Sequence, residues 1–178
     1  MPTDDELVDQ ACRGESGAFE ELIRRYERMV QVMAYGMVGS ADAQDVAQET
    51  FLEAYTSLSR FRRESSFKTW VTRILMHRAA NFIRRRATRA TYPLDTYLEI
   101  PDPSSGPVLA AEKNERDEMV QTAIARLPVE YREALVLRVS QGLSYEEIAA
   151  VLECAVGTVK SRLHNARERV ADYLKEHS

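Results

Sequence analysis

The sequence has few of the residues that mark disulfide-rich, metal-binding or membrane-spanning proteins. It contains two cysteines, Cys12 and Cys154, in 178 residues, which is too few for a disulfide scaffold. These cysteines form no Cys-x-x-Cys pair, and the three histidines are scattered, so no metal-ligand spacing is present. The longest stretch without a charge, residues 29–41, is shorter than the roughly 20 residues that a membrane-spanning helix needs.

Motifs of the common enzyme classes are also missing. We find no Walker-type phosphate loop, no Gly-x-Gly-x-x-Gly and no series of nucleophile, base and orienting acid. The N-terminus reads Met-Pro-Thr-Asp-Asp-Glu, whereas a secretory signal begins basic and continues apolar. We therefore expect a cytoplasmic protein that is not an enzyme and that uses no catalytic residue, metal or cofactor.

Positive charge is concentrated in two segments. The net charge is −4, with balances of −8 over residues 1–59, +9 over 60–91, −7 over 92–155 and +2 over 156–178. Such concentrations beside acidic stretches indicate a polyanionic partner at two places. A solvated charged face is the alternative explanation.

Apolar residues recur at intervals of three and four through most of the chain, which predicts helices. Residues 92–107 carry four of the six prolines, and proline lacks the amide hydrogen that a helix needs. We predict an all-α protein of two small helical domains, 1–87 and 111–178, joined by a flexible linker over 88–110. The helix that follows Pro128 is expected to bury Ala134, Leu135 and Val139.

The C-terminal helices have the layout of a helix-turn-helix unit. A short helix over 145–152, with a capping box at Ser144 and Glu147, is followed by a corner at 154–157. A longer helix then runs from about 156 to about 174. The longer helix carries one apolar stripe, and its basic and hydrogen-bonding residues should face outward together. Such side chains read base edges and grip phosphates, although an ordinary helical hairpin would share this pattern. The stripe is Val159, Leu163, Ala166 and Val170, and the outward residues are Lys160, Ser161, His164, Asn165 and Arg167.

The basic segment over 60–91 interleaves arginines with aromatic residues. Cations neutralise phosphates and exposed rings stack on unpaired bases, so this combination favours opened over duplex nucleic acid. Phe61 precedes the predicted helix and is the better contact candidate. Phe67 and Phe82 are more consistent with the core, and Trp70 fits either role.

Acidic and polar residues over 42–53 follow helical steps and form one face with apolar neighbours. This pattern is typical of a solvated helix face. Because Phe51, Leu52 and Tyr55 lie close by, it also fits a docking surface for a basic partner.

Five segments resemble the extracytoplasmic-function (group 4) sigma factors of the sigma-70 family. Residues 42–55 (DAQDVAQETFLEAY) and 61–74 (FRRESSFKTWVTRI) resemble region two. Residues 127–138 (LPVEYREALVLR), 142–149 (GLSYEEIA) and 156–163 (VGTVKSRL) resemble region four. The resemblance covers almost the whole chain, with the motifs in the family's order and the predicted linker between them.

The resemblance implies a dissociable subunit that directs core RNA polymerase to promoters. Region two would dock on the β′ coiled coil through Asp42, Asp45, Gln48, Glu49 and Leu52. It would also recognise and melt the −10 element through Phe61, Arg62, Arg63, Ser65, Phe67, Lys68, Trp70, Arg73, His77, Asn81, Arg84 and Arg85. Region four would touch the β flap and recognise the −35 element through Thr158, Lys160, Ser161, Arg162, His164, Asn165 and Arg167. An anti-sigma factor, often bound to the membrane, would control such a protein.

Three positions carry residues that are unusual for the family. They affect which promoter sequence we expect the protein to recognise, but not the class of activity. His77 stands where Asn is frequent, Asn81 where Asp is frequent and Asn165 where Arg is common. The main alternative function is an autonomous helix-turn-helix regulator, which would normally dimerise on a palindrome. No dimerisation helix or effector domain is evident. A protein-interaction module with a solvated basic face is the second alternative.

Overall fold

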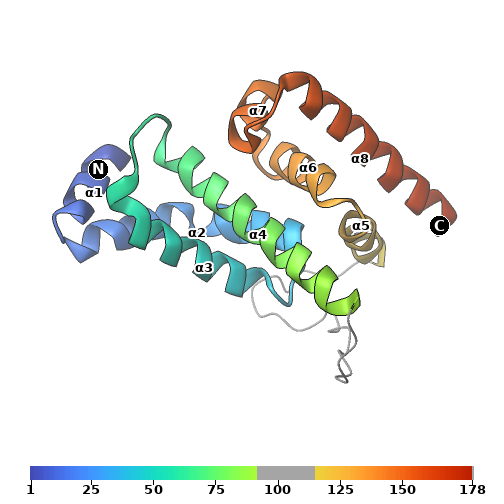
Figure 1. Cartoon of the computed structure of the whole chain (residues 1–178). Helices are drawn as coiled ribbons and strands as arrows, with labels where there is room; N and C mark the ends of the chain where they lie inside the picture. The colour runs from blue at the N-terminus through green and yellow to red at the C-terminus, as the bar shows by residue number, and fades with distance from the viewer. Residues whose placement is uncertain (92–114, 178) are drawn as a thin grey trace.

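The computed structural model describes residues 1–91 and 115–177, and every regular element in these ranges is a helix (Figure 1). The N-terminal unit comprises α1 (Asp4–Cys12), α2 (Ser16–Val38), α3 (Ala43–Ser57), the short 3-10 helix η1 (Leu58–Arg60) and α4 (Phe67–Thr91). The C-terminal unit comprises α5 (Glu115–Ala125), α6 (Val129–Gln141), α7 (Tyr145–Leu152) and α8 (Val156–Glu176). The predicted all-α class is confirmed.

Helix boundaries agree with the sequence signals where capping residues define them. Thr3 with Glu6 and Ser144 with Glu147 both form capping boxes, and α7 spans the predicted range. The last helix begins at Val156, as predicted. One exception is α4, which continues past the predicted domain end at 87 to Thr91. Most of the predicted linker lies outside the described residues, so the domain limits stay predictions.

The N-terminal unit is built around α2, which contacts α1, α3 and α4. Leu22, Val30 and Met33 of α2 are fully buried. The N-terminal helix is fastened to α2 by polar contacts. Tyr26 donates a hydrogen bond to the Asp4 carboxylate, and the Arg25 guanidinium lies 2.9 Å from the same carboxylate.

The C-terminal unit packs α6, α7 and α8 around a small apolar core. Leu137, Ile148, Val159 and Leu163 are each at most 1% exposed. The prediction for Val139 was wrong, since its side chain is 75% exposed. Residues 134–137 of α6 are all buried, whereas Val139, one helical turn beyond Leu135, faces solvent.

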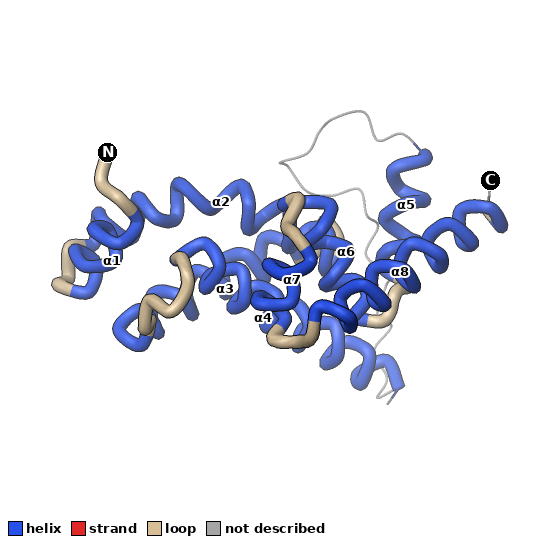
Figure 2. Tube along the Cα trace, turned by 90° about the horizontal axis from the view of Figure 1, so that it is seen from above, coloured by secondary structure: helices blue, strands red, loops and turns tan. Residues whose placement is uncertain are grey.

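The two units pack against each other in this structure. In both views α6 and α7 lie alongside the N-terminal unit (Figures 1 and 2), and α6 contacts α2 and α4 while α7 contacts α4. One apolar cluster includes buried residues of both units, Met37 and Leu75 on one side and Val136 and Ile148 on the other. Among the described helices, none is both long and apolar enough to cross a membrane.

Candidate nucleic-acid interface

The position of α8 is set by its packing on α6 and α7 and by the tight corner that follows α7. Residue Glu153, which follows α7, has a φ of 51°, in the left-handed region. The amide of Cys154 donates to the Ala149 carbonyl at 3.1 Å, and Ala155 is the N-cap of α8. This corner turns the chain so that α8 packs on α7 and α6 with its apolar stripe. The geometry is that of a helix-turn-helix unit.

The polar face of α8 is open to solvent over its N-terminal half. Val159, Leu163 and Ala166 are buried, and Val170 is half-buried. The predicted contact residues divide into exposed and half-buried members. Lys160, Ser161, His164 and Arg167 are exposed, whereas Thr158, Arg162 and Asn165 are half-buried.

The polar groups on this face are largely available to a ligand. Lys160 and Arg167 make no ion pair with another described residue, and His164 lies 3.4 Å from Glu168 on the same helix. The Ser161 hydroxyl donates to the Thr158 carbonyl at 2.9 Å, so its oxygen still has lone pairs to accept with.

The loop before α4 is organised by aromatic packing. Phe61 stacks on Trp70 with ring centroids 4.8 Å apart, and Phe67 lies between Tyr26 and Trp70 at 5.6 and 5.8 Å. Phe67 is only 1% exposed, so its predicted contact with DNA is wrong for this structure and its ring supports the loop from below. Phe61 and Trp70 are half-buried and keep part of their surfaces accessible.

The same loop is tied to the N-terminal helix through Arg63. This residue has a φ of 57°, a conformation that is strained for a residue with a side chain. Its guanidinium pairs with the Asp9 carboxylate of α1. The hydrogen bond from Arg63 lowers the pKa of Asp9 below its ordinary value. The neighbouring Ser66 accepts a hydrogen bond from the amide of Thr69 at 3.1 Å and thereby caps the start of α4.

Several arginines of α4 face other parts of the protein. Arg78 pairs with Glu49 at 3.5 Å and with Glu53, both on α3. Arg86 lies 2.8 Å from Asp42, at the start of α3. Towards the C-terminal unit, Arg73 donates to the Ala150 carbonyl at 2.8 Å and Arg84 lies 3.5 Å from Glu130. The cations of this segment that pair with no other described residue include Arg62, Lys68 and Arg85.

Two of the unusual residues contact each other. The amide nitrogen of Asn81 lies 3.0 Å from Nε2 of His77, one helical turn away. The two side chains thus share one hydrogen bond across a turn of α4. His77 is exposed, so its Nδ1 edge is available to a ligand.

The acidic face predicted on α3 is largely exposed. Asp45, Gln48 and Glu49 are exposed, and the apolar Leu52 and Tyr55 are 64% and 54% exposed. Asp42 differs, because its side chain is paired with Arg86 and only 24% exposed. The face therefore has an exposed apolar side chain with acidic and amide groups around it.

Sequence reasoning missed three polar residues that organise these surfaces. Asp9 holds Arg63, Glu130 faces Arg84, and Arg132 is buried with a relative exposure of 7%. A signal existed for Arg132, since it lies one helical turn before Leu135 and Val136 on the apolar side of α6. Asp9 and Glu130, the partners of Arg63 and Arg84, lie far from these arginines in the sequence, and hydrophobic periodicity carries no information about such pairs.

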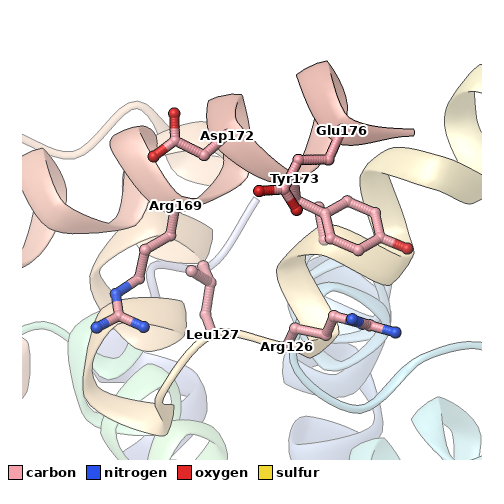
Figure 3. Close-up of a pocket in the computed structure, with 7 residues that line it drawn as sticks. Arg126, Leu127, Arg169, Asp172, Tyr173 and Glu176 are labelled. Carbon is pink, nitrogen blue, oxygen red and sulfur yellow. The ribbon is translucent and has the colours of Figure 1, made fainter. Parts of the chain in front are cut away.

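A shallow hollow of about 250 Å³ lies between α5 and the C-terminal half of α8 (Figure 3). Its lining is mixed, with Leu127 at its base and Arg126 4.9 Å from the ring of Tyr173. The residues of α8 that line the hollow are Arg169, Asp172, Tyr173 and Glu176, which follow residues 158–167, the polar part of this helix. Among the described residues, no group of three or more His, Cys, Asp or Glu side chains gathers as metal ligands would.

Comparison with known proteins gives a consistent result for both units. Residues 22–89 match the family model Sigma-70 region 2, and residues 117–170 match Sigma-70, region 4. The ECF RNA polymerase sigma-E factor of Haemophilus influenzae is 34% identical over 97% of this chain and 96% of its own length. The RNA polymerase sigma-H factor of Pseudomonas aeruginosa is 37% identical over 97% of this chain and 94% of its own.

Two solved structures are similar over both units. CnrH, solved in complex with the cytosolic domain of CnrY, matches with a TM-score of 0.71 and 26% identity over 98% of this chain and 99% of that one. The sigma factor RpoE of Bartonella quintana, solved with the anti-sigma factor NepR, matches with a TM-score of 0.66 and 25% identity. That match covers 88% of this chain and 96% of the Bartonella chain.

Proposed function

The chain belongs to the extracytoplasmic-function sigma factors of the sigma-70 family, and from this premise we propose how its residues divide the work of initiation. It is an alternative sigma factor that binds core RNA polymerase and directs transcription initiation at specific promoters. The observation that carries the residue-level proposal is the open polar face of α8 on a helix-turn-helix unit, joined in one chain to a basic helix with accessible aromatic rings.

We assign recognition of the −35 element to α8. Its N-terminal half enters the major groove, where Lys160, Ser161 and His164 reach base edges and Arg167 contacts a phosphate. The half-buried Thr158, Arg162 and Asn165 complete the surface. The loss of an arginine at position 165 removes one cation and leaves an amide, which favours hydrogen bonds with a base edge.

Recognition and melting of the −10 element belong to α4 and the loop that precedes it. Arg62, Lys68 and Arg85 contact phosphates, because they are exposed and make no ion pair with another described residue. Phe61 and Trp70 provide ring surface for unpaired bases, each stacked base contributing about 1–3 kcal/mol. Ser65 and the pair His77 and Asn81 add hydrogen-bonding groups, whereas Phe67 supports the loop from the core.

The exposed face of α3 is our candidate for docking on the β′ coiled coil. Leu52 lies among Asp45, Gln48 and Glu49, an apolar anchor with a polar rim. This surface suits a basic partner. Asp42 acts indirectly through Arg86, and the C-terminal unit contacts the β flap.

We further propose control by an anti-sigma factor, because two solved relatives were captured in complexes, one with CnrY and one with NepR. The factor works in the cytoplasm, where polymerase and promoter DNA are found, and a membrane-bound inhibitor would hold it at the membrane. The protein acts without catalysis of its own and without a cofactor, as the polymerase supplies the chemistry.

Reconstituted transcription tests the proposal. Purified protein and core polymerase are incubated with fragments of a genomic library, and transcripts are mapped to find initiation sites. We expect run-off transcripts from a subset of promoters and none with core polymerase alone. Absence of any transcript would reject the residue-level scheme. Tight binding to a symmetric operator without polymerase would favour an autonomous helix-turn-helix regulator.

A further inference from the structure

The contact between the two units is an extended interface with both apolar and polar parts. Met37 of α2 is 1% exposed and Val136 of α6 is 5% exposed, and both belong to the apolar cluster that includes residues of the two units. The backbone of α2 approaches α6 closely at Gly36. A Cβ atom placed there would lie 3.0 and 3.3 Å from the two methyl carbons of Val136, which are its nearest neighbours.

Arg132 crosses this interface from the C-terminal unit. Its guanidinium donates to the Met37 carbonyl at 2.7 Å, to the Leu127 carbonyl at 3.1 Å and to the Ala125 carbonyl. Its partners are thus main-chain oxygens at the C-terminal ends of α2 and α5, where helix carbonyls carry partial negative charge. Burial lowers the pKa of Arg132 below its ordinary value.

The bond to Met37 is the one that depends on contact between the units. Ala125 and Leu127 are in the same unit as Arg132 and would stay in place if the units separated. A buried cation needs polar partners to offset the loss of water. The α2 carbonyl supplies one such partner only while the units are packed, so Arg132 favours the packed arrangement.

Arg73 and Arg84, which the family resemblance assigns to the −10 element, both bond to the C-terminal unit. The Arg73 guanidinium donates to the Ala150 carbonyl of α7 at 2.8 Å, and Arg84 lies 3.5 Å from Glu130 of α6. A guanidinium held by these groups presents fewer donors to a phosphate. Binding of the −10 strand along this part of α4 and packing of α6 and α7 therefore compete for Arg73 and Arg84.

We propose that the C-terminal unit is an intramolecular clamp on the −10 surface: Arg132 and the Gly36–Val136 contact hold the chain closed, and closure withholds Arg73 and Arg84 from the opened strand. This inference rests on the assignment of α4 to the −10 element in the proposed function. Recognition of the −35 element is not withheld, because the polar face of α8 is exposed in the closed arrangement. The clamp thus acts on single-stranded and not on duplex DNA.

The decisive variant is Gly36→Leu in the full chain. Gly36 lies inside α2, and its φ is not in the left-handed region, so leucine favours the helix itself. The added side chain meets Val136 and pushes the units apart. Gly17→Leu is the matched control, because it makes the same change in α2 at an exposed position with no atom within 4 Å of the added Cβ.

Two measurements are made on each variant. Small-angle X-ray scattering reports the radius of gyration, and fluorescence anisotropy reports binding to a pool of short random-sequence single strands and to the matching duplexes. We expect Gly36→Leu to enlarge the radius of gyration while circular dichroism keeps its helical signal. If about a tenth of wild-type chains are open, single strands bind about tenfold more tightly. Duplex binding stays unchanged, and Gly17→Leu behaves like wild type.

Glu130→Lys provides an independent test should Gly36→Leu lose helical structure. The introduced lysine would face Arg84 with a like charge at a partly exposed site. Glu176→Lys is the control for the added positive charge. Glu130→Lys should enlarge the radius of gyration more than Glu176→Lys does. An unchanged radius in the folded variants, or enlargement without tighter binding of single strands, would overturn the clamp. Failure of run-off transcription with all variants would instead reject the proposed function and leave the scattering result intact.

Discussion

The two cationic helices, α4 and α8, differ in whether their basic side chains are bonded to other parts of the protein. On α8, Lys160 and Arg167 are exposed and pair with no other described residue. On α4, Arg73, Arg78, Arg84 and Arg86 each bond to a carbonyl or a carboxylate of another element. The strongly basic segment of the sequence is therefore neutralised in part by the fold, whereas Lys160 and Arg167 of the weakly basic segment stay available. Local net charge is a poor measure of the field that DNA meets.

The largest effect is expected from a substitution on the exposed polar face of α8. Lys160→Ala should lower initiation at −35-dependent promoters by about tenfold or more, because a specific base contact contributes about 1–3 kcal/mol. Run-off transcription with core polymerase measures this loss. Lys175→Ala is the matched control, since Lys175 is exposed on the same helix and pairs only with Asp172 at 3.5 Å. Equal losses in the two variants would contradict base recognition by the N-terminal half of α8.

Trp70→Ala should impair strand opening more than binding of the closed promoter complex. Removing one stacking surface costs about 1–3 kcal/mol per base, and this loss applies only once the strands have separated. Permanganate footprinting detects the opened thymines, and gel shifts measure total binding. Trp70→Phe, which retains a ring beside Phe61, is expected to recover part of the opening. Unchanged opening in Trp70→Ala would remove Trp70 from the −10 surface.

Unpaired and paired cations can also be compared within the basic segment, residues 60–91. Arg62→Ala should weaken DNA binding by the holoenzyme and lower the steepness of its salt dependence by about one unit, as expected for a lost phosphate contact. Arg86→Ala should change the salt dependence much less, because Arg86 pairs with Asp42 at 2.8 Å. Titration of binding against salt concentration compares the two. Similar slopes would show that internal pairing does not withdraw charge from DNA.

The smallest effect is expected from Asp9→Asn, which loosens Arg63. Arg63 holds the pKa of Asp9 below its ordinary value, so the native pairing stabilises the fold above the unfolded-state pKa of this group. That contribution is lost as the pH falls through the lower pKa of the folded state. The pair is exposed, and exposed pairs contribute little. Urea unfolding at neutral and acidic pH should show a slightly lower stability of the variant only at neutral pH.

The sequence predicted most of what depends on local pattern. Apolar periodicity and capping boxes located the helices, and the stripe of Val159, Leu163 and Ala166 correctly predicted the orientation of α8. Phe67 also follows helical periodicity, and its burial agrees with the apolar pattern more than with the family-based assignment to DNA. Val139 follows the apolar pattern of α6 but is exposed, because the pattern alone does not say how far along the helix the packing extends.

Contacts between distant segments escaped prediction for a physical reason. The partners of Arg63 and Arg84 are Asp9 and Glu130, more than forty residues away in each case, and charge counts cannot say which acid meets which base. Arg132 is different, since a polar residue on the apolar face of a helix is expected to be buried and hydrogen-bonded. Its acceptors are main-chain carbonyls, however, and these are present at every residue.

That choice of acceptor has a consequence for how the protein can change under selection. The carbonyls of Met37 and Ala150 belong to the backbone, so replacing either side chain leaves the oxygen in place. Substitutions at Arg132 and Arg73 thus remove a bond between the units directly, whereas the exposed Ala150 can be replaced without losing one. A screen for hyperactive alleles should collect its hits at Arg132, Gly36 and Val136 and rarely at residue 150.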